Sequence, residues 1–126
     1  MNLNGENLSY IGDAYFELLV REDLLKTISK NEILHKTAKL YTSGKMQALY
    51  IHYLIDNSLL SEEELKYFKK GRNTNNSHKR KNISIREHKE STGFESLIGY
   101  LYLENNKERI FELYNMMKKW VVNSAK

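Results

Sequence analysis

Residues 10–20, YIGDAYFELLV, combine a helical spacing of apolar side chains with a Gly12-Asp13 pair in their middle. Glycine weakens a helix by about 1 kcal/mol relative to alanine, and aspartate is a poor helix former. A carboxylate facing a core is also costly unless hydrogen bonds or a cation compensate it. The pair therefore indicates a helix that approaches another element closely at Gly12 and carries a functional carboxylate at Asp13.

The rest of the chain repeats the helical spacing, and it contains no proline and no clear strand pattern. Ser29-x-x-Glu32 and Ser61-x-x-Glu64 have the form of capping boxes, which favour helix starts at these positions. Gly44 is expected to break or bend the second helical segment. We predict an all-α single domain over residues 1–126, with helices at about 6–26, 29–43, 46–55, 61–70, 91–104 and 107–122.

Composition limits the class of protein. No apolar run approaches the roughly 20 residues that a membrane span needs. The first residues, MNLNGENLS, lack the basic and apolar regions of a signal peptide. Cysteine is absent, which excludes disulfides and thiolate metal sites and fits a reducing compartment. We therefore expect a cytoplasmic protein that does not bind a membrane.

Positive charge is concentrated in one segment of the chain. Residues 66–90 contain nine Lys or Arg and two acids, whereas the remainder contains eleven Lys or Arg and fourteen acids. Within this segment, residues 71–87, GRNTNNSHKRKNISIRE, lack helical periodicity and predict a flexible basic loop. Such a run is either a solvated loop or a surface for an anionic polymer, and the concentration of charge favours the polymer.

A second acid, Glu95, lies in an apolar helical pattern four residues before Gly99, in STGFESLIGYLYL. Positions four apart share a helix face, and glycines on such a face would let this helix and the one around Gly12 approach closely. Two carboxylates brought together in this way need a cation or a proton, and Mg²⁺ prefers carboxylate and water oxygens. Two alternatives stay open: Thr92-x-x-Glu95 is a capping box, or Asp13 is exposed or paired with Lys or Arg.

The stretches LSYIGDAYFELLVR, GRNTNN and STGFESLIGYLYL, in this order, resemble the catalytic domain of ribonuclease III. The resemblance covers nearly the whole chain and is strongest to the small bacterial branch, Mini-ribonuclease III, which has this domain alone. Its motifs are specific in combination: Gly-Asp in the first helix, Gly-Arg-Asn before a basic loop, and Phe-Glu-x-Leu-Ile-Gly in a later helix.

The resemblance implies an all-helical homodimer that cleaves double-stranded RNA with Mg²⁺, for which Mn²⁺ is expected to substitute. The family's metal ligands correspond to Asp13 and Glu95, which are therefore the expected catalytic and metal-binding residues. Two cations about 3.5–4 Å apart activate a water and stabilise the leaving oxygen, and the expected products carry a 5′-phosphate and a 3′-hydroxyl. A cation would also explain why the first helix tolerates Asp13.

Two positions depart from the larger ribonuclease III enzymes, which have further acids where this chain has Ser9 and Thr92. The small branch shows the same kind of loss, so catalysis is still expected, but the number of metals is left open. Glu6 and Glu17 share the side of Asp13 and are candidates to contact the ion through water, or else are solvated or ion-paired. The missing acids also leave open a non-catalytic double-stranded RNA-binding or ribosome-assembly factor of the same fold.

Affinity for RNA is expected to come from the catalytic domain, its dimer and any helper protein, because no sequence remains for a separate binding domain. A-form RNA is recognised mainly through its shape, phosphates and 2′-hydroxyls, which suits basic side chains. The first candidates are Arg72, Asn73, Lys79, Arg80 and Lys81, followed by Lys69, Lys70, Arg86 and Lys89.

The resemblance also implies partners. Relatives pack an aromatic residue at the position of Tyr10 into the other subunit, so Tyr10 is expected in a dimer interface or, alternatively, in the core of its own subunit. In the small branch the substrate is the precursor of large-subunit (23S) ribosomal RNA, and a large-subunit ribosomal protein assists. The residues themselves select no particular RNA.

Overall fold

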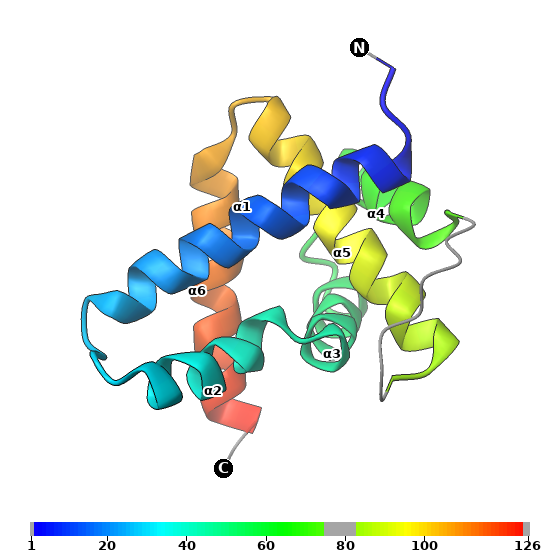
Figure 1. Ribbon diagram of the computed structural model, residues 1–126. Coiled ribbons are helices and arrows are strands. Elements are labelled where there is room, and N and C mark those ends of the chain that lie inside the picture. The colour runs from blue at the N-terminus through cyan, green and yellow to red at the C-terminus, as the bar shows by residue number, and fades with distance from the viewer. Residues whose placement is uncertain (1, 75–82, 125–126) are drawn as a thin grey trace.

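The protein is all-helical in the computed structural model, which describes residues 2–74 and 83–124 (Figure 1). These residues form six helices and no strand, as the sequence predicts. The helices are α1 (Gly5–Leu25), α2 (Asn31–Thr42), α3 (Gly44–Asp56), α4 (Glu62–Arg72), α5 (Ile85–Leu103) and α6 (Lys107–Ser124). None of the helices in these two ranges has the length and apolarity to cross a membrane.

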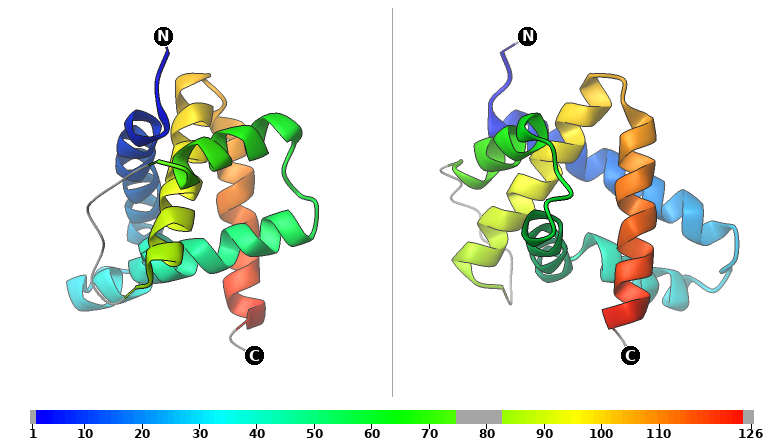
Figure 2. Two further views of the ribbon diagram at one scale, coloured as in Figure 1. Left: turned by 90° about the vertical axis from the view of Figure 1, so that its right-hand side faces the viewer. Right: turned by 180° about the vertical axis from the view of Figure 1, so that it is seen from behind.

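Helix α5 occupies the centre of the molecule, where α1, α3 and α4 pack around it (Figure 2). Every residue from Glu90 to Gly99 is buried, although this stretch includes polar and charged side chains. Helix α6 lies behind α1 in Figure 1 and contributes apolar side chains such as Ile110 and Met117 to the same core. This stretch of α5 has no solvent face, so its polar side chains depend on partners within the protein rather than on water.

Glycines allow the central helices to approach one another at backbone distance. A Cβ atom added to Gly12 would lie 1.8 Å from the carbonyl oxygen of Glu95, and one added to Gly99 would lie 1.9 Å from that of Leu8. These two glycines define the crossing of α1 over α5. Gly71 makes a similar approach between α4 and α5.

Aromatic side chains fill the space around this crossing. Phe16 of α1 packs edge to face against Phe94 of α5 and Tyr114 of α6. Tyr50 of α3 is fully buried, and its hydroxyl donates to the carbonyl oxygen of Leu113 at 2.5 Å. Burial is the main reason why the pKa of Tyr50 lies well above its ordinary value. These contacts pack α1, α3 and α6 together with α5 in one core.

The starts of two helices differ from the sequence predictions. The predicted capping box at Ser61 and Glu64 is confirmed by reciprocal hydrogen bonds of 3.1 and 2.9 Å. The one predicted at Ser29 is wrong, because α2 begins after Lys30 and has no side-chain cap. Helix α5 begins at Ile85 rather than near residue 91, because Ser84 and Glu87 form a capping box ahead of two polar turns.

The predicted basic loop is correspondingly shorter than residues 71–87. Gly71 and Arg72 form the end of α4, and the residues from Ile85 onward belong to α5. The end of α4 and the start of α5 therefore lie closer together along the chain than the hydropathy pattern indicates. Residues 75–82 lie outside the described part of the chain.

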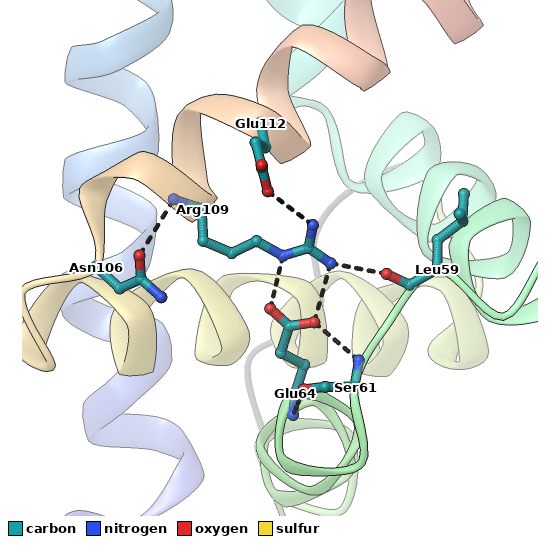
Figure 3. A network of polar contacts seen from close by, with 6 residues as sticks. All are labelled: Leu59, Ser61, Glu64, Asn106, Arg109 and Glu112. Atoms are coloured by element: carbon teal, nitrogen blue, oxygen red, sulfur yellow. Dashed lines mark hydrogen bonds and ion pairs between the residues drawn. The ribbon is translucent and has the colours of Figure 1, made fainter.

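An ion-pair network ties α6 to the start of α4 (Figure 3). The guanidinium of Arg109 donates through Nε and Nη2 to the two carboxylate oxygens of Glu64, at 2.8 and 3.0 Å, and Nη2 also donates to the carbonyl oxygen of Leu59 at 2.7 Å. Burial by itself raises the pKa of Glu64, but hydrogen bonds from Arg109 and Ser61 outweigh this effect and hold the pKa below its ordinary value. The pair supplies a charged contact within the packed helices.

Candidate active site

The two predicted acids lie at the crossing of α1 and α5. Gly12 contacts the backbone of Glu95, and Asp13 is the next residue of α1. Ser9 lies one helical turn before Asp13, and its hydroxyl donates to Glu95 Oε1 at 3.2 Å. The glycine-mediated approach expected from the sequence therefore places Asp13 and Glu95, which are 82 positions apart, on the two helices that cross here.

The environments of the two carboxylates are unequal. Glu95 is only 3% exposed, whereas Asp13 is exposed to solvent. Asp13 therefore needs no cation to remain in its helix, and the explanation expected for its tolerance there is wrong. The energetic argument applies to Glu95 instead, because a buried carboxylate requires compensation.

The alternative role of Glu95 in a capping box is also excluded. Glu95 lies in the middle of α5, ten residues after its first residue, Ile85. The hydroxyl of Thr92 donates to the carbonyl oxygen of His88 at 2.9 Å, within the same helix. Glu95 therefore has no helix terminus to cap, and its carboxylate lies on the side of α5 that faces Ser9.

Glu6 and Glu17 occupy the surface of α1 on either side of the crossing. Glu6 is exposed in the first turn of the helix. Glu17 accepts a hydrogen bond from Arg21 Nε at 3.3 Å, which matches the ion-paired alternative for this residue. A contact of either acid with the ion's water ligands stays a prediction.

The oxygen atoms at the crossing fit a hard divalent cation. Asp13 and Glu95 supply carboxylate oxygens, and Ser9 supplies a hydroxyl oxygen beside Glu95. In the two described ranges, no group of three or more His, Cys, Asp and Glu side chains converges as a metal site. Mg²⁺ suits so small a set, because it commonly binds through one or two carboxylates and retains several waters.

A second polar region lies where α3, α4 and α5 meet, in a cleft of about 530 Å³. Arg72 and Asn73, both predicted to bind RNA, lie on its edge, and Arg72 Nε donates to Asn73 Oδ1 at 3.2 Å. Lys79, Arg80 and Lys81 lie outside the described residues. The lining residues are His52, Arg72, Asn73, Ile85, Arg86, Lys89 and Glu90.

Sequence reasoning missed the role of Glu90 in this cleft. Glu90 is buried, forms an ion pair with Arg86 at 3.3 Å and contacts Nε2 of His52. The i, i+4 spacing of Arg86 and Glu90 indicates an ion pair only if the helix begins as early as Ile85. No sequence pattern indicates the contact of Glu90 with His52 of α3. Glu90 offsets part of the cleft's positive charge by pairing with Arg86. Among the described residues, the other two cationic side chains of the cleft, Arg72 and Lys89, form no ion pair with Glu90.

Tyr10 lies on the outside of the molecule. It is 84% exposed, so its alternative placement in the core of its own subunit is wrong. An aromatic side chain this exposed, beside the candidate site on α1, is suited to contact another molecule.

Comparison with known proteins agrees with this geometry. The Ribonuclease III domain model matches residues 6–106, and the chain therefore belongs to the ribonuclease III domain family. The resemblance inferred from the three motifs is confirmed.

The most informative relatives belong to one group within that family. The chain is 40% identical over 120 residues to Mini-ribonuclease 3 of Enterococcus faecalis, covering 94% of this chain and 91% of the relative. It is 39% identical over 114 residues to Mini-ribonuclease 3 of Staphylococcus aureus, covering 90% and 85%. The crystal structure of protein FN1578 from Fusobacterium nucleatum superimposes with a TM-score of 0.83 at 30% identity, over 94% of this chain and 93% of the other.

Proposed function

We propose that this protein is a divalent-metal-dependent endoribonuclease that cleaves double-stranded RNA. Membership of the ribonuclease III domain family and the similarity to Mini-ribonuclease 3 proteins support the class of reaction. The observation that supports the assignment to this chain's own residues is the crossing of α1 and α5, where Gly12, the neighbour of Asp13, packs on the backbone of Glu95 and Ser9 hydrogen-bonds to the Glu95 carboxylate.

Asp13 and Glu95 are the residues that would hold the cation, which we assign as Mg²⁺ with Mn²⁺ as a substitute. When bound, a divalent cation neutralises charge on the scissile phosphate and activates water for hydrolysis. Asp13 is exposed and therefore accessible to an RNA substrate, whereas the backbone of buried Glu95 is packed against Gly12 at the crossing. Hydrolysis at such a site leaves a 5′-phosphate and a 3′-hydroxyl.

RNA binding in this proposal combines the described cleft with the basic segment. Arg72 and Lys89 supply positive charge, and Asn73 supplies a hydrogen-bonding amide. Lys79, Arg80 and Lys81 extend the charge along the chain between α4 and α5. This set suits a polymer whose phosphates and 2′-hydroxyls are uniform along a shallow groove.

The active form is proposed to be a homodimer with Tyr10 in its interface. Two sites related by a two-fold axis would face the two strands of one duplex and make a staggered cut. The expected substrate is a precursor of large-subunit ribosomal RNA, with a large-subunit ribosomal protein as a candidate helper. Comparing cleavage of this precursor with and without that protein tests both assignments.

The central experiment incubates an end-labelled RNA duplex with the protein, with Mg²⁺ or with a chelator. Cleavage is expected only with the metal, and Asp13→Asn and Glu95→Gln should each abolish it. Glu22→Gln, an exposed acid on α1, is the matched control and should cleave normally. Products are identified by the sensitivity of their 5′ ends to phosphatase.

One observation favours a second candidate function. Uncharged Ser9 and Thr92 leave only two acids at the crossing, which suits a double-stranded RNA-binding or ribosome-assembly factor without turnover. Duplex binding by the wild type without cleavage, under every metal condition, would support that candidate and contradict the nuclease.

A further inference from the structure

We propose that Ser9 is a positioning residue that orients the Glu95 carboxylate for one divalent cation. The inference rests on the proposed function of the α1–α5 crossing. Its physical basis is the hydrogen bond from Ser9 Oγ to Glu95 Oε1, at 3.2 Å, which joins the two helices across 86 positions of sequence.

The backbones on both sides of this hydrogen bond are fixed. Gly12 packs against the carbonyl group of Glu95, and Gly99 packs against that of Leu8, the residue before Ser9. The hydroxyl and the carboxylate therefore meet because the helix crossing places them together. A side-chain contact supported by such packing is suited to hold one rotamer of Glu95.

The acceptor of the Ser9 hydroxyl is unusual for a serine within a helix. Serine and threonine hydroxyls in helices often donate to the carbonyl oxygen four residues earlier. Thr92, three residues before Glu95 on α5, does so by donating to the carbonyl oxygen of His88 at 2.9 Å. Ser9 instead donates to a side chain of another helix, so its hydroxyl is used for the site rather than for its own helix.

Burial strengthens the hydrogen bond between Ser9 and Glu95. Ser9 is 9% exposed and Glu95 is 3% exposed, so water competes weakly for the carboxylate oxygen. A hydrogen bond to a charged acceptor in such surroundings is stronger than one between neutral groups. Ser9 uses its single donor on Oε1 and adds no charge, so Asp13 and Glu95 together balance the charge of one divalent ion.

The test measures Mn²⁺ binding to the protein alone, by electron paramagnetic resonance or calorimetry, without RNA. Ser9→Ala should weaken binding by about 10-fold or more, as is typical when a group that orients a metal ligand is lost. Ser96→Ala is the matched control, because Ser96 is a fully buried serine on α5 for which no hydrogen bond is seen among the described residues. It should bind Mn²⁺ as the wild type does.

A second pair of variants separates the hydroxyl from the volume of the side chain. Ser9→Thr retains the hydroxyl and Ser9→Val replaces it with a methyl group of similar size. Binding close to that of the wild type is expected for Ser9→Thr, with a loss of about 10-fold for Ser9→Val. This comparison stays informative even if Ser9→Ala does not fold, because threonine and valine have nearly the same volume and differ in the hydroxyl group.

The outcomes distinguish this inference from the function on which it rests. If Glu95→Gln weakens Mn²⁺ binding while Ser9→Ala and Ser9→Val bind within twofold of the wild type, the role of Ser9 is wrong and the nuclease proposal stands. If neither Glu95→Gln nor Asp13→Asn weakens binding, the proposed metal site itself is wrong. A cleavage deficit of Ser9→Ala that disappears at high Mg²⁺ supports positioning, because the loss then lies in metal affinity.

Discussion

At the scale of the residue, Asp13 and Glu95 show that one function can place opposite demands on two side chains. Asp13 is exposed and can be altered without disturbing the core, whereas Glu95 is buried at a helix crossing. The two acids therefore differ in what a substitution costs the fold, although both are proposed to hold the same ion.

This difference gives the first prediction. Asp13→Asn should change the free energy of unfolding by less than about 0.5 kcal/mol, because exposed substitutions away from specific contacts are nearly neutral. Its cleavage rate should nevertheless fall more than about 100-fold, because a direct ligand of the ion is lost. Urea denaturation and single-turnover cleavage measure the two effects. A variant that loses activity only in proportion to its loss of folded protein would contradict the assigned role.

Gly12 gives a second prediction at the same scale. Gly12→Ala adds a Cβ atom that would lie 1.8 Å from the carbonyl oxygen of Glu95, so α1 and α5 must separate. We expect a loss of about 3 kcal/mol or more, at the upper end for overpacked cores, despite alanine's higher helix propensity. Urea denaturation measures the loss. Glu22→Ala, an exposed change in the same helix, is the control and should be nearly neutral.

At the scale of the element, the start of α5 controls the placement of the basic cleft. The Ser84 side chain accepts a hydrogen bond from the backbone N–H of Glu87, and Arg86 and Lys89 lie within the first five residues of the helix. The first three residues of α5 are exposed or half-buried, and burial begins at His88, so local capping rather than packing favours the helical form of this first turn.

Ser84→Ala should therefore destabilise the protein by about 1 kcal/mol and weaken binding of an RNA duplex severalfold. Mn²⁺ binding should stay unchanged, because Glu95 lies three turns further along α5. Ser29→Ala is a matched control, since α2 begins after Lys30 without a side-chain cap. Equal losses in both variants would show that the cap at Ser84 has no special role.

Sequence patterns were informative for elements where the signal is local. The capping box at Ser61 was readable because its partners are three residues apart. The start of α5 was missed, although Ser84-x-x-Glu87 has the same form, because the basic and polar run around it lacks apolar periodicity. The pattern at Ser29 has this form too and makes no cap, which shows that a motif is only a candidate until the backbone adopts the turn.

At the scale of the whole molecule, the ion pair between buried Glu64 and half-buried Arg109 links stability to pH. Its partners hold the folded-state pKa of Glu64 below the ordinary 4.5. The stabilisation is therefore complete above about pH 4.5 and is lost as the pH falls through the lower folded-state value.

Glu64→Gln should cost about 2 kcal/mol at neutral pH, because the charge-assisted hydrogen bonds between Glu64 and Arg109 are weakened while Arg109 keeps its ion pair with Glu112. From about pH 6 to about pH 3, its free energy of unfolding should fall less steeply than that of the wild type. Glu17→Gln, which breaks the exposed pair with Arg21, should cost less than about 1 kcal/mol and keep the wild-type slope. Thermal or urea denaturation across this pH range measures both, and parallel pH curves for Glu64→Gln and the wild type would contradict the linkage.

Long-range charge gives the last prediction. Replacing Lys79, Arg80 and Lys81 together by glutamine should weaken duplex binding and reduce the slope of log affinity against log salt by up to about three. Fluorescence anisotropy over a range of salt concentrations measures it. An unchanged slope would exclude this segment as an RNA contact.

The sequence alone determined the helical class, the three family motifs and the identity of the two acids, because periodicity and residue type are properties of short stretches. Only the tertiary structure decided that Glu95 is buried and Asp13 exposed, that Ser9 reaches Glu95, and that Arg109 pairs with Glu64. Burial and partner choice depend on how distant helices cross, and here backbone contact at glycines sets the crossing of α1 and α5.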